Sequence, residues 1–82
     1  MQYDASAFAI TIRTIRKERG LTQEVLSGLA GIARSHLSMI ETGDKVASVE
    51  TLWKIANALD MRLSALVQQA ENRMRPCENE PK

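Results

Sequence analysis

The sequence predicts an all-α fold of five short helices, and three observations lead to this fold class. Apolar residues recur at the three- and four-residue spacing of an amphipathic helix, as Phe8, Ile12 and Ile15 do. No segment alternates apolar and polar residues as a half-buried strand does. Glycine residues that can end a helix, and serine and threonine residues that can cap one, are separated by segments of the length of a short helix. Residues 1–74 are therefore predicted to form one helical domain.

The composition limits both the core and the class of protein. Eighty-two residues suffice for one core, and with 44% hydrophobic but only 4% aromatic residues this core must be largely aliphatic. No apolar run approaches the roughly 18 residues that a membrane span needs, and no secretory signal is recognisable. The only cysteine, Cys77, can form neither an intrachain disulfide nor a cysteine-based zinc site. We therefore expect a protein of the reducing cytoplasm with no membrane partner.

The first two helices are delimited by glycine and threonine. A helix over about residues 5–19 is expected to end at Gly20, which readily adopts the left-handed conformation of a helix end. Thr22 is a good N-cap because its hydroxyl can accept a hydrogen bond from the first turn. A second helix is therefore predicted over about residues 23–30.

A third helix is predicted to follow closely, from near Ala33 to just before Gly43. Between the second and third helices, Gly31 can adopt the positive φ of a tight turn. The apolar residues spaced to anchor both helices on one core are Leu26, Ala30, Ile32, Leu37 and Ile40. This arrangement is that of a helix-turn-helix, and it leaves polar side chains of the later helix exposed for a DNA major groove.

Two further helices are predicted after a loop at residues 43–47. Ser48 is expected to cap the fourth helix and Ser64 the fifth, with a short connection at Asp60 and Met61. The residues expected to face inward are Val49, Leu52, Ile55, Ala56 and Leu59 in the fourth helix, and Leu66, Val67, Ala70 and Met74 in the fifth. The composition then turns polar, so residues 75–82 are predicted to be a disordered tail.

The stretch from Leu21 to Gly43 resembles the helix-turn-helix of phage repressors and Cro proteins, also called the xenobiotic-response-element family. The resemblance continues through Ser-Val-Glu-Thr-Leu at 48–52 and Lys-Ile-Ala-Asn-Ala-Leu at 54–59, and it covers about residues 6–68. It implies a five-helix, lambda-repressor-like fold with the motif as helices two and three. It also implies a sequence-specific, DNA-binding transcriptional regulator that acts as a homodimer on a palindromic or pseudopalindromic operator.

The resemblance also implies roles for individual side chains. The positions expected to reach base edges are Arg34, Ser35, His36 and Met39. Those expected to contact DNA phosphate are Gln23, Ser38, Thr42 and Lys45. Arg16 and Glu41 match a partly buried ion pair that ties the first helix to the end of the third. The plainer alternatives are a solvated surface arginine at Arg34 and an idle loop charge at Lys45.

Three positions depart from the family pattern. Ser27 stands where alanine is commoner, and its hydroxyl is expected to bond back along its own helix. Ala33 replaces a capping serine or threonine, which weakens the start of the third helix by about 1 kcal/mol. Met39 replaces a usually polar base-reading residue, which favours an apolar contact with a thymine methyl group.

Trp53 has two interpretations. It falls off the main apolar stripe of the fourth helix, so it lies either at the edge of the core or in a dimer interface, where aromatic residues are enriched. In the second interpretation its companions in the dimer interface would be Leu63, Leu66, Val67 and Ala70.

The sequence leaves three alternatives to a plain transcriptional regulator open, partly because of its charge. Eleven basic and ten acidic residues give a net charge of +1, which is weak for a DNA-binding protein. The antitoxin of a toxin–antitoxin pair and a restriction–modification controller would use the same fold, with a toxin or RNA polymerase as a further partner. A helical protein-interaction module that has lost DNA binding is a third alternative.

An enzyme, a metal and a cofactor are not expected. The sequence offers no paired nucleophile and base, no cluster of metal ligands and no phosphate-binding loop. The only histidine, His36, has no second ligand near it in the sequence. Cys77 is interpreted either as an incidental thiol of the tail or as a redox switch.

Overall fold

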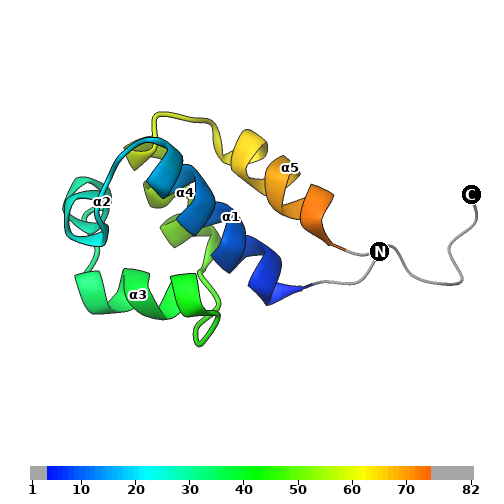
Figure 1. Ribbon diagram of the computed structural model, residues 1–82, viewed down its shortest axis with the longest axis horizontal. Coiled ribbons are helices and arrows are strands. Elements are labelled where there is room, and N and C mark those ends of the chain that lie inside the picture. The colour runs from blue at the N-terminus through cyan, green and yellow to red at the C-terminus, as the bar shows by residue number, and fades with distance from the viewer. Residues whose placement is uncertain (1–3, 75–82) are drawn as a thin grey trace, which may run out of the picture.

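The computed structural model describes residues 4–74, which form five α-helices (Figure 1). These are α1 (Ala5–Glu18), α2 (Gln23–Ala30), α3 (Arg34–Thr42), α4 (Val49–Ala58) and α5 (Leu63–Arg73). No strand occurs between residues 4 and 74. The all-α, five-helix prediction is confirmed. The predicted tail at 75–82, with Cys77, lies outside the described residues.

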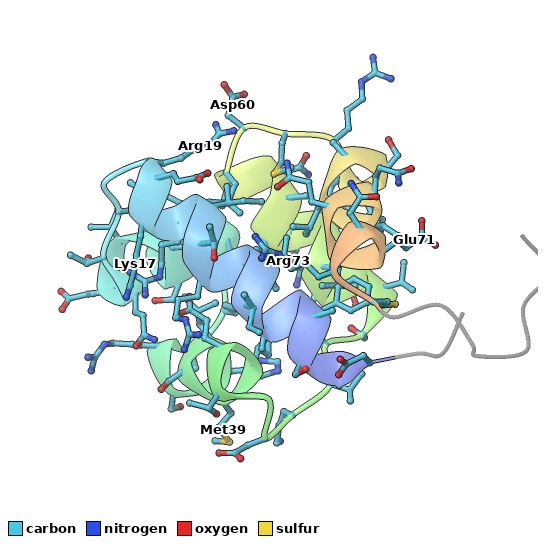
Figure 2. The ribbon with its side chains drawn as sticks, turned by 45° about the vertical axis from the view of Figure 1, so that its right-hand side comes forward. Lys17, Arg19, Met39, Asp60, Glu71 and Arg73 are labelled. Carbon is cyan, nitrogen blue, oxygen red and sulfur yellow. The ribbon has the colours of Figure 1, made fainter. Side chains whose placement is uncertain are left out.

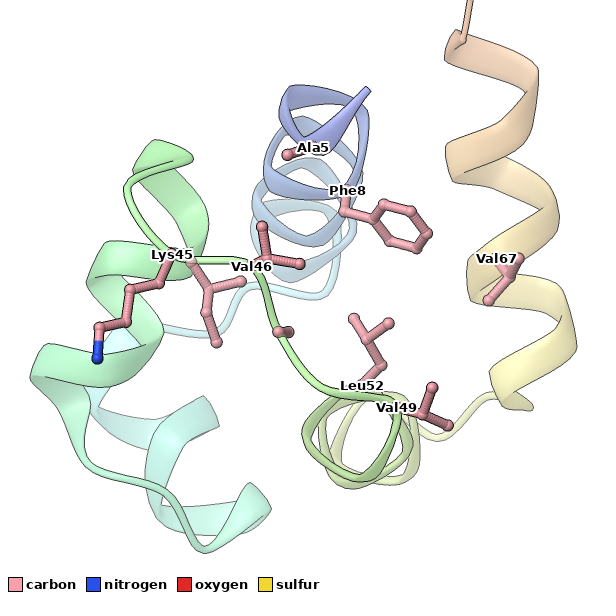
Figure 3. A pocket seen from close by; sticks show the side chains of 9 residues that line it. Ala5, Phe8, Lys45, Val46, Val49, Leu52 and Val67 are labelled. Carbon is pink, nitrogen blue, oxygen red and sulfur yellow. The ribbon is translucent and has the colours of Figure 1, made fainter. Parts of the chain in front are cut away.

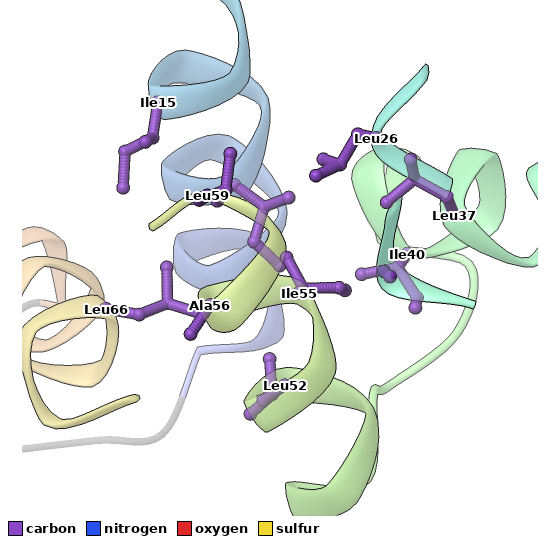
Figure 4. Close-up of a cluster of buried hydrophobic side chains, with 11 residues drawn as sticks. Ile15, Leu26, Leu37, Ile40, Leu52, Ile55, Ala56, Leu59 and Leu66 are labelled. Carbon is purple, nitrogen blue, oxygen red and sulfur yellow. The ribbon is translucent and has the colours of Figure 1, made fainter. Parts of the chain in front are cut away.

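The helices enclose one core. α1 packs against α3 and α5, α2 packs against α3 and α4, and α4 also packs against α5. The buried side chains that meet between the helices (Figure 4) are Ile12, Ile15, Leu26, Ala30, Leu37, Ile40, Leu52, Ile55, Ala56, Leu59 and Leu66. Every helix contributes to this cluster, and burial of apolar area is the main stabilising term. The orientation of α3 is therefore set by the whole core, through Leu37 and Ile40.

Side-chain caps mark the start of three helices. Asp4, Thr22 and Ser48 each accept a hydrogen bond from a backbone N–H two or three residues later, at 3.0 to 3.1 Å. The predicted caps of α2 and α4 are thus confirmed. α3 starts after Ala33 without a side-chain cap, as the sequence predicts.

The turn between α2 and α3 depends on glycine. Gly31 has φ of +72°, a left-handed conformation that strains any residue with a Cβ. The Ile32 N–H donates to the Ser27 carbonyl at 3.0 Å and closes the turn. The predicted helix-turn-helix is therefore present as α2, this turn and α3.

Two predictions about α4 and α5 are wrong. Val49 is 70% exposed, because it lies in the first turn of α4 at the edge of the buried stripe that continues at Leu52. α5 begins at Leu63 with Arg62 at the N-cap position, and Ser64 is not its cap. Leu63 packs against the core, and this tertiary contact favours an earlier start of the helix.

Candidate nucleic-acid interface

α3 presents one face to the core and the opposite face to solvent. Ser35, Met39 and Thr42 follow one another at i, i+4 and i+7 and form the ridge that lies farthest from the buried Leu37 and Ile40. All three ridge residues are exposed, and Met39 points outward beneath the helix (Figure 2). An α-helix with such a ridge has the dimensions that a DNA major groove admits.

The other candidate residues of α3 flank this ridge. Arg34 is exposed in the first turn, where a long side chain has room to extend past the helix. His36 and Ser38 are half-buried on the two sides of the ridge. The structure therefore gathers the expected base-reading residues on one surface, with His36 less exposed than Arg34, Ser35 and Met39.

A buried ion pair joins α1 to the end of α3. Arg16 Nε donates to Glu41 Oε2 at 2.8 Å, and Arg16 Nη2 donates to Glu41 Oε1 at 2.9 Å. Arg16 Nη1 also donates to the Leu21 carbonyl at 2.9 Å. With Arg16 only 9% and Glu41 only 2% exposed, this bidentate arrangement operates away from water, where charge-assisted hydrogen bonds are strong. The pair implied by the family resemblance is thus present.

Gln23 connects the same carboxylate to α2. Its Nε2 donates to Glu41 Oε1 at 3.1 Å, so Glu41 accepts three hydrogen bonds from two side chains. The amide nitrogen of glutamine carries two hydrogens, and one remains for another acceptor. Within residues 4–74, no buried side-chain nitrogen or oxygen lacks a hydrogen-bond partner. Arg16, Gln23 and Glu41, called the ion-pair network below, therefore brace α1, α2 and α3 against one another.

The loop after α3 is held by its own hydrogen bonds. The Thr42 hydroxyl lies 3.0 Å from both the Met39 carbonyl and Asp44 Oδ2. The Lys45 N–H also donates to the Met39 carbonyl, at 3.2 Å. Lys45 is exposed, and so is the neighbouring Asp44, whose negative charge sequence reasoning did not consider. The hydrogen bond between Thr42 and Asp44 leaves Lys45 as the loop side chain best suited to an anion.

Ser27 behaves as its place in the sequence suggests. It is 4% exposed, and its hydroxyl donates to the Glu24 carbonyl of the preceding turn at 3.0 Å. The small side chain permits close packing, and the backward hydrogen bond satisfies its hydroxyl without a partner from another helix.

The residues expected in a dimer interface divide into two groups. Leu66 and Ala70 are both 0% exposed and belong to the interior, which corrects their placement on a dimer surface. α5 packs on α1 and α4, and this i, i+4 pair is the side that it turns inward. Trp53 is 54% exposed, while Leu63 and Val67 are half-buried. Of the five predicted interface residues, Trp53, Leu63 and Val67 remain candidates for contact with another chain.

Residues 4–74 contain no group of three histidine, cysteine, aspartate or glutamate side chains placed to hold a metal ion. No helix among them is long and apolar enough to cross a membrane.

The fold and this surface define a helix-turn-helix domain whose second motif helix is exposed along one ridge. A helix-turn-helix family model (HTH_3) matches residues 12–66, more than half of the chain. The chain therefore belongs to this family.

Two curated relatives are similar to most of the chain. It is 45% identical over 56 residues to the immunity repressor protein of Bacillus phage phi105, a match that covers 68% of this chain and 39% of the relative. It is 28% identical over 72 residues to the HTH-type transcriptional regulator SutR of Escherichia coli (strain K12), covering 88% of this chain and 40% of that one. The chain thus spans about 40% of the length of both relatives.

A solved structure matches over nearly its whole length. The restriction-modification controller protein C.AhdI from Aeromonas hydrophila is 35% identical, with a TM-score of 0.75. The match covers 77% of this chain and 96% of that one. The arrangement of the helices is therefore shared with a controller protein that this match covers almost completely.

Proposed function

We propose that this chain is a sequence-specific DNA-binding domain of a transcriptional regulator, with α3 as its recognition helix. The observation that carries the proposal is the way in which α3 is fixed to the rest of the fold. One face is locked into the core, its last turn is locked by the ion-pair network, and Ser35, Met39 and Thr42 project along the opposite ridge. Rigid presentation of side chains to base edges is what sequence reading requires. The names of the relatives support the same function.

The candidate residues fall into two kinds of DNA contact. Arg34 is proposed to donate two hydrogen bonds to guanine, Ser35 and His36 to bond neighbouring base edges, and Met39 to pack on a thymine methyl group. Lys45, Gln23 and Ser38 are proposed to contact phosphate, and so is Thr42, whose hydroxyl would turn from Asp44 to the anion. Because the net charge is only +1, phosphate attraction must come from such local groups and not from the whole molecule.

The domain is proposed to act as a homodimer in the cytoplasm, on an operator with two-fold symmetry. Two recognition helices in successive major grooves on one side of DNA would lie about 34 Å apart. A restriction–modification controller is the second candidate function, since the match to a protein of that class covers 96% of its chain.

Selection of bound fragments from a random pool of duplex DNA tests this function. We expect recovery of a symmetric sequence, and an affinity that falls steeply between 50 and 200 mM salt, roughly as expected for counterion release. Binding that selects no sequence, or that does not respond to salt, would overturn the proposal.

A further inference from the structure

The loop that follows α3 places a carboxylate at the C-terminal end of the exposed ridge. Asp44 is exposed, and its Oδ2 lies 3.0 Å from the hydroxyl of Thr42, the last residue of that ridge. The Met39 carbonyl, which the same hydroxyl reaches at 3.0 Å, already accepts the Lys45 N–H. A hydroxyl has one hydrogen to donate, and the charged carboxylate is the stronger of its two acceptors. The Thr42 hydrogen is therefore directed to Asp44 in the free protein.

The negative charge of Asp44 is not neutralised by a neighbouring side chain. No basic side chain of residues 4–74 lies within ion-pair distance of this carboxylate. The other acidic residue in α3 and the loop at 43–47 is Glu41, which is buried and paired with Arg16. A carboxylate beside the C-terminus of α3 also lies at the negative end of the helix dipole, where it does not favour folding. The stability of the fold therefore does not explain an acidic residue at this position.

The loop at 43–47 separates a charged surface from an apolar one. On one side, Val46 and Val49 help to line an apolar hollow of about 280 Å³ beside α4 and α5 (Figure 3). The Lys45 ammonium points away from the other labelled side chains of that hollow (Figure 3). Asp44 is held by Thr42, at the end of the ridge. The two charged side chains of the loop therefore lie apart from its apolar side, and Asp44 lies on the side of α3.

We propose that Asp44 is an internal competitor of DNA phosphate, and that it limits the affinity of the domain for DNA of any sequence. The proposal rests on the proposed function, in which Thr42 and Lys45 contact the DNA backbone. To donate to a phosphate oxygen, the Thr42 hydroxyl must release the Asp44 carboxylate. The released carboxylate then lies close to a second anion. DNA binding at this end of α3 thus requires the loss of one hydrogen bond and the approach of two negative charges.

An internal competitor changes which contacts supply the free energy of DNA binding. Non-specific binding depends almost entirely on the attraction between basic groups and phosphate. Asp44 opposes the attraction of the neighbouring Lys45, so that the loop as a whole has no net charge. A larger share of the binding free energy must therefore come from the base contacts of α3, and this is the share that distinguishes one sequence from another.

Titration of a random-sequence duplex with the whole chain tests the proposal. Asp44→Asn removes the charge but keeps an oxygen that can accept a hydrogen bond from Thr42. We expect it to bind about fivefold more tightly than wild type at about 100 mM salt, with a salt slope steeper by about one. Equal affinity of Asp44→Asn and wild type would overturn the proposal.

Asp60→Asn is the matched control, because it removes the same charge from another exposed aspartate. Asp60 lies at the opposite end of the molecule from Met39 (Figure 2), and asparagine tolerates its positive φ of 58°. Its charge is screened from DNA bound at α3, so Asp60→Asn should bind as wild type does. Equal gains in the two variants would show an effect of net charge alone and would overturn the proposal.

A neutral linkage in the DNA backbone locates the competition. A methylphosphonate in place of one phosphate lacks the negative charge that Asp44 opposes. On a duplex selected by the protein, we expect one linkage in each half-site at which this replacement removes most of the gain of Asp44→Asn. Replacement at the other linkages should leave the gain unchanged. A gain that no single replacement reduces would contradict competition at a phosphate.

Sequence selection separates failure of this proposal from failure of the proposed function. Wild type and Asp44→Asn should select the same sequence, since phosphate contacts carry no sequence information; a changed base preference would show that Asp44 faces a base instead. If Asp44→Asn binds a random duplex more tightly but neither protein selects a sequence, only the proposed function fails. If wild type selects a sequence that Asp44→Asn binds no more tightly, only the role of Asp44 fails. If neither binds duplex DNA, both fail.

Discussion

The two ends of α3 are held in different ways. At the C-terminal end, Glu41 is 2% exposed and accepts three hydrogen bonds, and Gly43 ends the helix with φ of +85°. At the N-terminal end, Ala33 provides no side-chain cap, and Arg34 and Ser35 are exposed. Orientation is thus secured at one end of a nine-residue helix, while Arg34 and Ser35, which are proposed to read DNA, are displayed from the other.

The largest effect on stability is expected from removing the buried ion pair at the C-terminal end of α3. Arg16→Met leaves the Glu41 carboxylate buried with only the Gln23 amide as partner, and loss of one member of a buried pair costs about 3–5 kcal/mol. Urea unfolding should show a correspondingly lower midpoint. Arg13→Met, at an exposed position of the same helix, is the matched control.

The double variant Arg16→Met/Glu41→Met sharpens this test. Replacing both charges by apolar side chains removes the unpaired carboxylate, so we expect it to recover much of the lost stability. If Arg16→Met unfolded within 0.5 kcal/mol of Arg13→Met, the network would not be what secures α3.

The network also shows what the sequence can and cannot predict. The caps at Thr22 and Ser48 each depend on a residue three positions away, so the local sequence pattern is enough to predict them. Arg16 and Glu41 are 25 residues apart, and only resemblance to a family suggested that they pair. The hydrogen bond from Gln23 to Glu41 needs the packing of three helices, which no local pattern encodes.

Burial at the edges of helices was the least predictable feature. The apolar spacing of α4 and α5 identifies a stripe but not its width, and the packing of neighbouring helices decides where it ends. Val49 therefore lies outside the core while Leu66 and Ala70 lie inside it. The apolar hollow beside Val49 could not be foreseen, because residues of α1, α3, α4, α5 and the loop at 43–47 together form its wall.

The next largest effects concern DNA binding by Arg34, at the exposed start of α3, and by Lys45, in the loop after α3. Arg34→Ala is expected to relax the preference at one base position by about 1–3 kcal/mol, while Lys45→Ala weakens all sequences alike and reduces the salt slope by about one. Competition binding with single-base operator variants measures both. Arg62→Ala, on the connection between α4 and α5 at the opposite side from α3 (Figure 1), is the control. Equal and unselective losses for Arg34→Ala and Lys45→Ala would contradict these roles.

A smaller effect is expected from supplying the cap that α3 lacks. Ala33 has φ of −66° and ψ of 142°, an extended conformation of the kind that a capping serine adopts. Ala33→Ser should therefore raise the free energy of unfolding by about 1 kcal/mol. Gln69→Ser, at an exposed position in the middle of α5, should not stabilise the protein, since the backbone N–H groups there are already paired within the helix. A neutral Ala33→Ser would mean that the start of α3 is already secured by its packing.

The smallest effect concerns Asp4, which gives α1 the side-chain cap that α3 lacks. Its carboxylate accepts hydrogen bonds from the Ser6 hydroxyl at 2.6 Å and the Ser6 N–H at 3.0 Å, and these bonds lower the pKa of Asp4. Because the folded-state pKa lies below the unfolded value, the cap stabilises the protein above the unfolded pKa and is lost as pH falls through the folded one.

Titration of the Asp4 carboxyl by NMR should therefore give a pKa below that of an unstructured peptide, with Ser6→Ala moving it upward. Asp4→Asn, which keeps a capping oxygen but does not titrate, should remove this contribution to the acid sensitivity of α1. The start of α3 has no titrating cap at Ala33, so no matching contribution is expected there. An Asp4 that titrates as it does in an unstructured peptide would show that the difference between the two helix starts is not electrostatic.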